Sequence, residues 1–442
     1  MRGTTKRDRR RRSSTALVLA LGLVATACGG GGVEGDAAAP ESEDGGQEVS
    51  DDDGGGGAAD DGGAAEGDPI RIGMATTLSG SIALFGEANR NAAQLAVEEI
   101  NEAGGLLGRP VELIVRDDHA APEEGVSIAR DLIIDEGVVA MLGPVSSGVA
   151  LAMTEVSAER QVPFIVHTSN TEALTTSSFQ PYFVSVVPNT GMEARAQGVD
   201  LADEGIMSWA TIAPNYEFGQ AQVGTFVETI QGENPDVQII DQQWPELGES
   251  DYQPFITAIL GRSPEAVYSP LFAGDLVTFS QQAANLGFFD SDVYFTALYE
   301  TDALRELGDS VDLEGVRAYS RCPFTIDTPE MASFVERYQD RYGEVPSDWA
   351  CMAYDATMLW AAVVEENGDT DADMFVETVE GFEFTSLRGD ITIRPEDHQG
   401  SVSSYIAELT YSDEHGMYIY GDITEVPAED IWLSVEDLEA AR

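Results

Sequence analysis

The sequence has very little positive charge. Its 442 residues include 23 Lys and Arg against 79 Asp and Glu, and the formal net charge is −56. Lys6 is the only lysine, so almost every cationic side chain is an arginine. Proteins that bind nucleic acids need clustered basic residues to contact the phosphates, and adhesion to anionic lipid needs them as well. Neither function is expected here. The acidic excess instead indicates a solvated surface whose self-repulsion is screened by salt.

Histidine is also scarce, and the common catalytic motifs are missing. The four histidines include no H-E-x-x-H pair and no Cys/His spacing that would hold a metal. The sequence has neither a G-x-S-x-G nucleophile turn nor a G-x-x-x-x-G-K-[ST] phosphate loop. His167 follows an expected strand, but a lone histidine is more often structural. We therefore predict no enzyme activity, no metal and no cofactor.

The first 28 residues have the pattern of an export signal. A basic segment, residues 2–12, precedes a short apolar run, residues 16–27. This run is shorter than the roughly 20 residues of a spanning helix, and it predicts a secretory signal over residues 1–27. Cys28 follows, and with Ala25-Thr26-Ala27 it resembles the lipobox of bacterial lipoproteins. That resemblance implies cleavage before Cys28 and its lipidation, which gives stable anchoring with two or more acyl chains. The alternative is an ordinary signal with an incidental cysteine.

A low-complexity segment separates this signal from the remaining chain. Residues 29–68 are almost entirely Gly, Ala, Asp, Glu and Ser, without a basic residue. Such a composition cannot bury enough apolar surface to offset its ordering entropy. We predict that residues 28–68 form a flexible acidic tether, with a reach of roughly 35 Å for a Gly-rich coil.

Two cysteines remain once Cys28 is assigned to the anchor. Cys322 and Cys351 form an even remainder, which suggests a disulfide in an oxidising compartment. Two separate buried thiols are the alternative, because the sequence does not show whether their Cβ atoms approach each other.

The body, residues 69–442, alternates strands with helices and is long enough for two or three domains. The expected strands cover residues 70–75, 111–115, 138–142, 163–166, 183–187, 209–213, 237–241, 266–269, 293–295 and 316–320. The expected helices cover residues 85–103, 122–136, 149–160, 192–204, 218–231, 252–260, 275–286, 329–342 and 347–366. The pattern restarts near residue 189, which predicts two α/β lobes with parallel sheets. Ligands bind beyond the carboxyl ends of such strands.

Three segments at these strand ends carry a family resemblance. They are residues 76–86, which lead into NAAQLAVEEINEAGGLLGRPVELIVRDD, residues 142–147 (LGPVSS) and residues 163–170 (PFIVHTSN). Together they resemble the leucine/isoleucine/valine-binding proteins of ATP-driven importers. The resemblance covers residues 69–410, and no single segment would be specific alone.

The resemblance implies a type I periplasmic-binding fold. Two doubly wound parallel-sheet lobes would be joined by a hinge of three crossovers, near residues 188–189, 321–322 and 399–400. Lobe 1 would comprise residues 69–189 and 322–399, and lobe 2 residues 190–321 and 400–442. A ligand would bind between the lobes and close the hinge.

The resemblance also implies ligand contacts in the first lobe. Ser147, with Ser146 as a weaker neighbour, matches a serine whose amide and hydroxyl hold the ligand's carboxylate; helix capping is its alternative role. Thr168 matches a residue that offers its backbone carbonyl to the ammonium. Asn170 replaces a threonine that touches both groups, and an Asx-turn is its alternative role.

Aromatic residues and an acid complete the implied site. Phe85 in the first lobe matches an aromatic of the family, and Phe218 and Phe272 match two tyrosines of the second lobe. Packing in the core is the alternative for all three. The family glutamate that pairs with the ammonium aligns with Leu298, and Tyr299 and Glu300 lie just beyond it.

The ligand depends on whether Glu300 takes the glutamate's place. If it does not, a buried ammonium would lack a charged partner, which is costly. The ligand could then be an amide, a urea-like molecule or an aromatic or aliphatic carboxylate.

The expected function is that of a solute-binding receptor outside the cytoplasm, lipid-anchored to the cell membrane. It would deliver a small amino acid of the branched-chain type, or a related polar solute, to the permease and ATPase subunits of an ABC importer. The alternative is a sensor-type receptor for amides, urea or small carboxylates that reports to a membrane partner.

Overall fold

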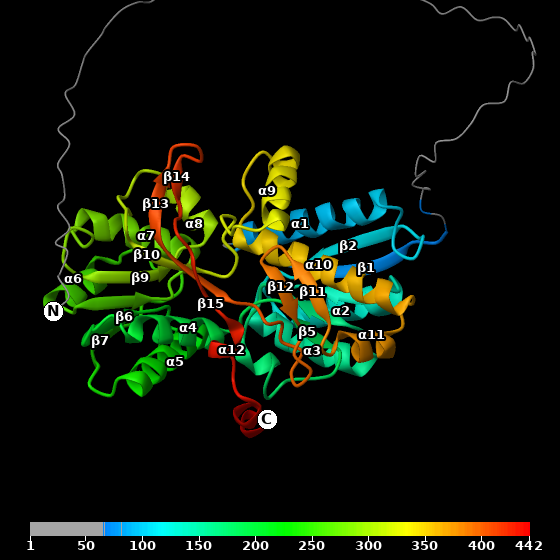
Figure 1. Cartoon of the computed structure of the whole chain (residues 1–442), viewed down its shortest axis with the longest axis horizontal. Helices are drawn as coiled ribbons and strands as arrows, with labels where there is room; N and C mark the ends of the chain where they lie inside the picture. Colours follow the sequence, from blue (N-terminus) through cyan, green and yellow to red (C-terminus); the bar gives the residue numbers. More distant parts are fainter. Residues whose placement is uncertain (1–64, 66, 81) are drawn as a thin grey trace, which may run out of the picture. The chain divides into compact units, whose positions relative to one another are not determined.

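The computed structural model describes residue 65, residues 67–80 and residues 82–442 (Figure 1). The predicted signal peptide, Cys28 and nearly all of the predicted tether lie outside these residues. The described residues belong to one compact unit. In this part of the chain, no helix is both long enough and apolar enough to cross a membrane.

The first sheet has five parallel strands in the order β2-β1-β3-β4-β5. Its strands are β1 (Ile70–Thr76), β2 (Val111–Asp117), β3 (Ala140–Leu142), β4 (Phe164–Val166) and β5 (Phe183–Ser185). The connecting helices are α1 (Ala83–Glu102), α2 (Pro122–Arg130), which continues as a π-helical turn (Asp131–Asp135), and α3 (Ser147–Arg160). β3, β4 and β5 are buried at every position, as expected for parallel strands covered on both faces.

The second sheet has the order β14-β13-β10-β9-β8-β6-β7, and β15 pairs with β13. Its parallel strands are β6 (Ser208–Ile212), β7 (Gln238–Gln243), β8 (Ala266–Ser269), β9 (Tyr294–Leu298) and β10 (Arg317–Ser320). α4 (Thr190–Ala202) precedes β6, and the helices between these strands are α5 (Glu217–Glu233), α6 (Gln253–Arg262), α7 (Ala273–Asn285) and α8 (Thr301–Leu307). Three antiparallel strands complete this sheet, namely β13 (Ser404–Ser412), β14 (Met417–Tyr420) and β15 (Thr424–Val426).

The chain between β10 and β13 returns to the first lobe. It forms α9 (Pro329–Tyr342), α10 (Asp348–Asn367), α11 (Ala372–Val379) and the hairpin of β11 (Glu383–Ser386) and β12 (Gly389–Thr392). α10 is buried at most positions and packs along α1 (Figure 1). A helix that is apolar around most of its surface needs such cover on several sides. The chain ends with α12 (Ala428–Ile431) and α13 (Val435–Ala441).

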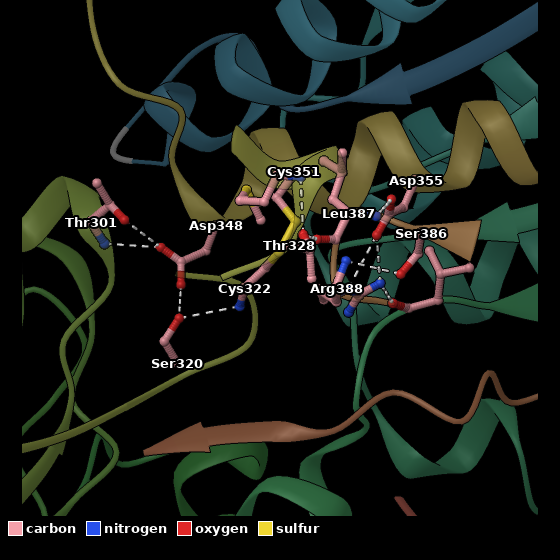
Figure 2. Close-up of a disulfide and its surroundings, with 12 residues drawn as sticks. Thr301, Ser320, Cys322, Thr328, Asp348, Cys351, Asp355, Ser386, Leu387 and Arg388 are labelled. Carbon is pink, nitrogen blue, oxygen red and sulfur yellow. Dashed lines mark hydrogen bonds and ion pairs between the residues drawn. A yellow bond between two sulfur atoms is a disulfide. The ribbon is translucent and has the colours of Figure 1, made fainter. Parts of the chain in front are cut away.

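The chain passes between the two sheets three times, after β5, β10 and β12. The first and third passages are hydrogen-bonded to each other. The Ser185 amide donates to the His398 carbonyl at 3.0 Å, and the Gly400 amide donates to the Ser185 carbonyl at 2.8 Å. The second passage is fixed by a disulfide between Cys322 and Cys351, whose Cα atoms are 6.3 Å apart (Figure 2). The fold is therefore the predicted α/β arrangement of two doubly wound lobes with a three-crossover hinge.

The sequence pattern located most of the long elements and several short strands, but it missed the short helices. The strand over residues 266–269 and the helix over residues 329–342 have the predicted bounds. α8, α11, α12 and α13 were not predicted, because helices of four to eight residues show too few apolar repeats to reveal a period.

Candidate ligand-binding site

The loop after β3 leads into α3 and contains Ser146 and Ser147. Ser146 is the N-cap residue and Ser147 is the first helical residue, so the alternative that Ser147 caps this helix is wrong. The described residues offer no capping hydrogen bond to the Ser146 side chain. Both serines are half-buried. Because the first amides of a helix lack partners within it, they form a natural site for an anionic group.

The loop after β4 begins with five buried polar residues, His167 to Thr171. The Thr168 hydroxyl donates to Asn89 Oδ1 at 3.2 Å and contacts His167 Nδ1 at 2.8 Å. Complete burial lowers the pKa of His167 to about 3, so this imidazole is neutral at physiological pH. The Asn170 amide donates to Glu193 Oε2 at 3.0 Å and to the Pro188 carbonyl at 3.3 Å. Asn170 therefore joins this loop to the first crossover and to α4.

The sequence interpretation missed a buried arginine. Arg321 begins the second crossover, is 5% exposed and forms an ion pair with Glu193 through Nε and Nη2. Its Nη1 donates to the Thr168 carbonyl at 3.5 Å. Its guanidinium carbon lies 5.0 Å from the centre of the Trp349 ring, a cation–π arrangement. Burial disfavours the charge, but Glu193 outweighs burial and raises the pKa of Arg321 above its usual value.

Trp349 is the ring that contacts this arginine among the described residues, and further aromatic rings pack together in each lobe. Phe85 and Trp349 in the first lobe have ring centres 4.5 Å apart. In the second lobe, Phe218 lies edge-on to Phe272 at 5.6 Å and stacks on Tyr216 at 5.9 Å. Phe272 also packs against the apolar cluster that contains Phe85 and Trp349. The three predicted aromatic residues, Phe85, Phe218 and Phe272, are thus linked by packing contacts. Part of the surface of each ring is buried in the core.

Glu300 lies at the N-cap of α8 and is 1% exposed. Its Oε1 accepts a hydrogen bond from the Ala273 amide at 2.6 Å, whereas its buried Oε2 has no hydrogen-bond partner among the described residues. Burial raises the pKa of Glu300 to about 8, hydrogen bonds from backbone amides oppose the increase, and the nearby Asp348 and Asp302 add to it. The carboxyl group is therefore mostly protonated at neutral pH.

Tyr299 does not lie with these residues. It is fully buried in the core of the second lobe, and its hydroxyl is 2.8 Å from Ser280 Oγ. Its carbonyl accepts a hydrogen bond from the Tyr420 hydroxyl at 2.9 Å. Side chains alternate along an extended chain, so Tyr299 and Glu300 point in different directions. We correct the prediction accordingly and exclude Tyr299 from the site.

The charged groups connect the two halves of the site. When Glu300 is ionised, its charge adds to the raised pKa of Arg321. Burial raises the pKa of Tyr216, and the positive charge of Arg321 partly offsets that increase. Arg321 is thus close to the second-lobe loops as well as to Thr168. The only available signal in the sequence was an arginine at the predicted crossover, where a side chain has access to the cleft.

A further set of hydrogen bonds joins the lobes beside the disulfide. Figure 2 shows Asp348, at the start of α10, between Thr301 and Ser320. Asp348 Oδ2 accepts from the Thr301 amide at 3.0 Å and from the Thr301 hydroxyl at 2.9 Å. Asp348 Oδ1 accepts from the Ser320 hydroxyl. Because Thr301 begins α8 of the second lobe, these bonds hold the lobes together on this side.

A family model described as periplasmic binding protein matches residues 69–415. The chain belongs to this family. The matched region includes both sheets except the last strands of the second one. The family and its relatives are binding proteins, which supports the prediction of a non-enzyme at the level of the family.

Curated relatives of this periplasmic binding protein have related names. It is 24% identical over 365 residues to "Leu/Ile/Val-binding protein homolog 6" of Brucella melitensis, a match that covers 80% of this chain and 91% of that protein. It is 41% identical to "Leu/Ile/Val-binding protein BraC3" of Rhizobium johnstonii over 106 residues, which are 24% of this chain and 29% of that relative. The second match is therefore local.

Solved structures of ABC-transporter solute-binding proteins have the same fold as this periplasmic binding protein. One from Rhodopseudomonas palustris BisB5, in complex with 3,4-dihydroxybenzoic acid, is 24% identical with a TM-score of 0.75 and covers 81% of this chain and 98% of its own. An amino acid ABC transporter substrate-binding protein from Pseudomonas fluorescens Pf-5 is 21% identical with a TM-score of 0.76. The match covers 84% of this chain and 98% of that protein's chain. At these identities the likeness shows the fold alone.

Proposed function

We propose that this periplasmic binding protein captures one small carboxylate-bearing solute between its lobes, outside the cytoplasm, and delivers it to an ABC importer. The supporting observation is that Arg321 at the second crossover donates to the Thr168 carbonyl of the first lobe and interacts electrostatically with Glu300 of the second lobe. The proposed lobes are residues 69–189 with 322–399, and residues 190–321 with 400–442. The permease and ATPase subunits of the importer are the proposed partners.

The proposed ligand contacts come from both lobes. The amides and hydroxyls of Ser146 and Ser147 would receive the carboxylate, as the start of α3 favours an anion. Asn170, whose side-chain amide donates to the Pro188 carbonyl at the first crossover, would be a further contact. Phe85 would provide an apolar wall on the first lobe, and Phe218 and Phe272 would provide one on the second.

The solute class has two candidates, which the relatives illustrate. A branched-chain amino acid would place its ammonium between the Thr168 carbonyl and an ionised Glu300. A plain carboxylate, like the dihydroxybenzoic acid bound by the R. palustris protein, has no ammonium to place. Both share a carboxylate and an apolar body.

Closure of the cleft would couple binding to transport. The hydrogen bonds between Asp348 and Thr301 join the lobes, so a ligand that contacts both lobes would stabilise this closed arrangement. Only the closed form would present the solute-loaded surface to the permease.

Ligand screening by thermal unfolding tests this function. A ligand that binds only the folded state stabilises it by about 2.7 kcal/mol at 100 times its Kd. We expect Tm to rise with at least one amino acid, amide, urea or small carboxylate, and uptake of that solute to be lost when the gene is deleted. A solute that binds while its uptake continues unchanged would instead favour a sensor.

The lipid anchor is a separate proposal that rests on Cys28 and the preceding apolar run. We expect the wild-type protein in the membrane fraction and the Cys28→Ser protein in the soluble extracytoplasmic fraction. Equal partitioning of the two proteins would contradict anchoring through this cysteine.

A further inference from the structure

Arg321 donates to the same backbone carbonyl that is expected to receive the ammonium of an amino acid. The family resemblance implies that the Thr168 carbonyl accepts a hydrogen bond from the ligand's ammonium. In the structure, the same carbonyl accepts one from Arg321 Nη1 at 3.5 Å. A second cation at this carbonyl would lie beside a buried guanidinium, and like charges at such a distance repel strongly where water is excluded.

Arg321 also has N–H groups that donate to no described protein group. A guanidinium carries five N–H groups and is always charged. Nε and Nη2 bond to Glu193, and Nη1 bonds to Thr168. Among the described residues these three bonds leave one N–H on each terminal nitrogen without a protein acceptor. Two parallel N–H groups of this kind match the two oxygens of a carboxylate.

Glu300 favours the same kind of ligand. Its Oε2 is buried and has no hydrogen-bond partner in the described part of the chain. The charged groups around it are Arg321 of the crossover, Asp302 of α8 and Asp348 of α10. Two carboxylates and complete burial keep its proton bound, and a protonated carboxyl donates a hydrogen bond to a carboxylate oxygen. An ammonium would require this group to lose its proton.

The second-lobe side of the site suits a flat apolar body. Tyr216 and Phe218 follow β6, and Phe272 follows β8, so all three rings come from the carboxyl ends of adjacent strands. They form a continuous series of ring contacts. Aromatic rings bind other rings in offset or edge-to-face geometry with a gain beyond that of buried area.

We propose that the cleft selects an aromatic carboxylate that lacks an α-ammonium group, and that Arg321 is the residue that determines this specificity. The inference rests on the proposed function as a receptor for one small solute. The ligand's carboxylate lies between the free edge of Arg321, the protonated Glu300 and the start of α3. Its ring lies against Phe218 and Phe272.

Calorimetric titration of the purified protein with four acids tests the ligand class. The probes are benzoate, phenylalanine, leucine and 4-methylpentanoate, the last being leucine without its ammonium. We expect benzoate to bind at least about 100-fold more tightly than either amino acid, and 4-methylpentanoate to bind more tightly than leucine. If leucine binds more tightly than 4-methylpentanoate, the selection against ammonium is overturned.

The same titration, extended to an amide and to urea, separates this inference from the proposed function. If an amide or urea binds while every carboxylate fails, the inference is wrong and the receptor function stands. If none of these solutes binds, both the inference about ligand class and the proposed receptor function are overturned for the solutes tested.

The variant Arg321→Lys tests the specificity residue. Lysine keeps the positive charge beside Glu193 but loses the planar pair of N–H groups. We expect benzoate to bind about 10-fold or more weakly, since charge-assisted paired hydrogen bonds are the strong ones. The matched control is Arg317→Lys, because Arg317 begins β10, the strand that ends just before Arg321, and pairs with Asp200.

The control variant should bind benzoate as the wild type does. Unchanged affinity in Arg321→Lys, with a Tm equal to that of the control, would overturn the assignment. If Arg321→Lys fails to fold, Phe272→Leu gives a second test. Leucine removes the ring and keeps an apolar side chain, so benzoate should bind more weakly, while 4-methylpentanoate should bind about equally.

Discussion

At the scale of single residues, the site depends on charges that the fold has removed from water. Glu193 and Arg321 compensate each other in a buried pair, and removal of one member of such a pair leaves an uncompensated charge. Glu300 has no such cation bonded to it, so it keeps its proton instead. The difference between these two glutamates comes from their neighbours, since their side chains are identical.

The raised pKa of Glu300 predicts a pH dependence of stability. The folded protein holds a proton on this group up to about pH 8, whereas the unfolded chain releases it near pH 4.5. The stabilising contribution is thus fully present below pH 4.5 and is lost as the pH rises through 8. We expect wild type to lose roughly 3–5 kcal/mol from this group between pH 4.5 and pH 9.

Urea unfolding of wild type and Glu300→Gln at several pH values measures this contribution. Glutamine cannot ionise, so the variant should gain stability relative to wild type as the pH rises. Glu306→Gln on the exposed side of the same helix is the control. A constant difference between wild type and Glu300→Gln across the window would refute the expectation.

At the scale of elements, α10 organises the hinge side of the site. Its first turn contains Asp348, Trp349 and Cys351, which contact α8, Arg321 and the second crossover. A single rigid helix therefore fixes three groups that the chain supplies from separate segments. The disulfide adds a covalent link between α10 and the residue next to Arg321.

Loss of the disulfide should reduce both stability and ligand affinity. The two cysteines are 29 residues apart in sequence, and closure of a loop of that length stabilises by roughly 3–4 kcal/mol in the chain-entropy treatment. We expect the double variant Cys322→Ser, Cys351→Ser to unfold at a lower temperature. Its affinity should fall as well, because Arg321 and Trp349 lose their common support.

Reductant gives an independent check of the same link. Dithiothreitol should lower the Tm of the wild type toward that of the double variant and leave the variant unchanged. A wild-type Tm that does not respond to reduction, with complete reduction shown by mass, would contradict this role.

At the scale of the whole molecule, we expect the hydrogen bonds between the lobes to favour the closed position of the hinge. The Thr301 hydroxyl of the second lobe donates to Asp348 of the first lobe at 2.9 Å. We expect this bond to contribute to the closed state, so that its loss favours opening of the hinge. Thr301→Val removes the hydroxyl and preserves the shape of the side chain.

We expect Thr301→Val to weaken the bound ligand's affinity about 5-fold, because a net hydrogen bond contributes about 1 kcal/mol. The loss should appear mainly as faster dissociation. Thr229→Val is the control, since that hydroxyl bonds to a carbonyl of its own helix at 2.8 Å. Equal dissociation rates for the two variants would show that the contact does not govern closure.

The sequence by itself determined the alternation of strands and helices, the two lobes and the family, because these depend on local apolar periods and on short motifs at strand ends. It also indicated that the loops after β3, β4, β6 and β8 contain ligand-contacting residues. Tertiary structure alone decided which side chains in those loops meet. Arg321 lies 153 residues from Thr168 in sequence, and no local pattern records such a distance.

The same reason explains the errors at the level of single residues. Tyr299 and Glu300 are neighbours in the chain, yet the first is part of the second-lobe core and the second caps α8 and bonds to the Ala273 amide. Whether Glu300 holds its proton depends on burial and on Asp302 and Asp348, which are brought to it by packing. Only the folded chain could decide these points, because burial and nearby charge are properties of the assembled lobes.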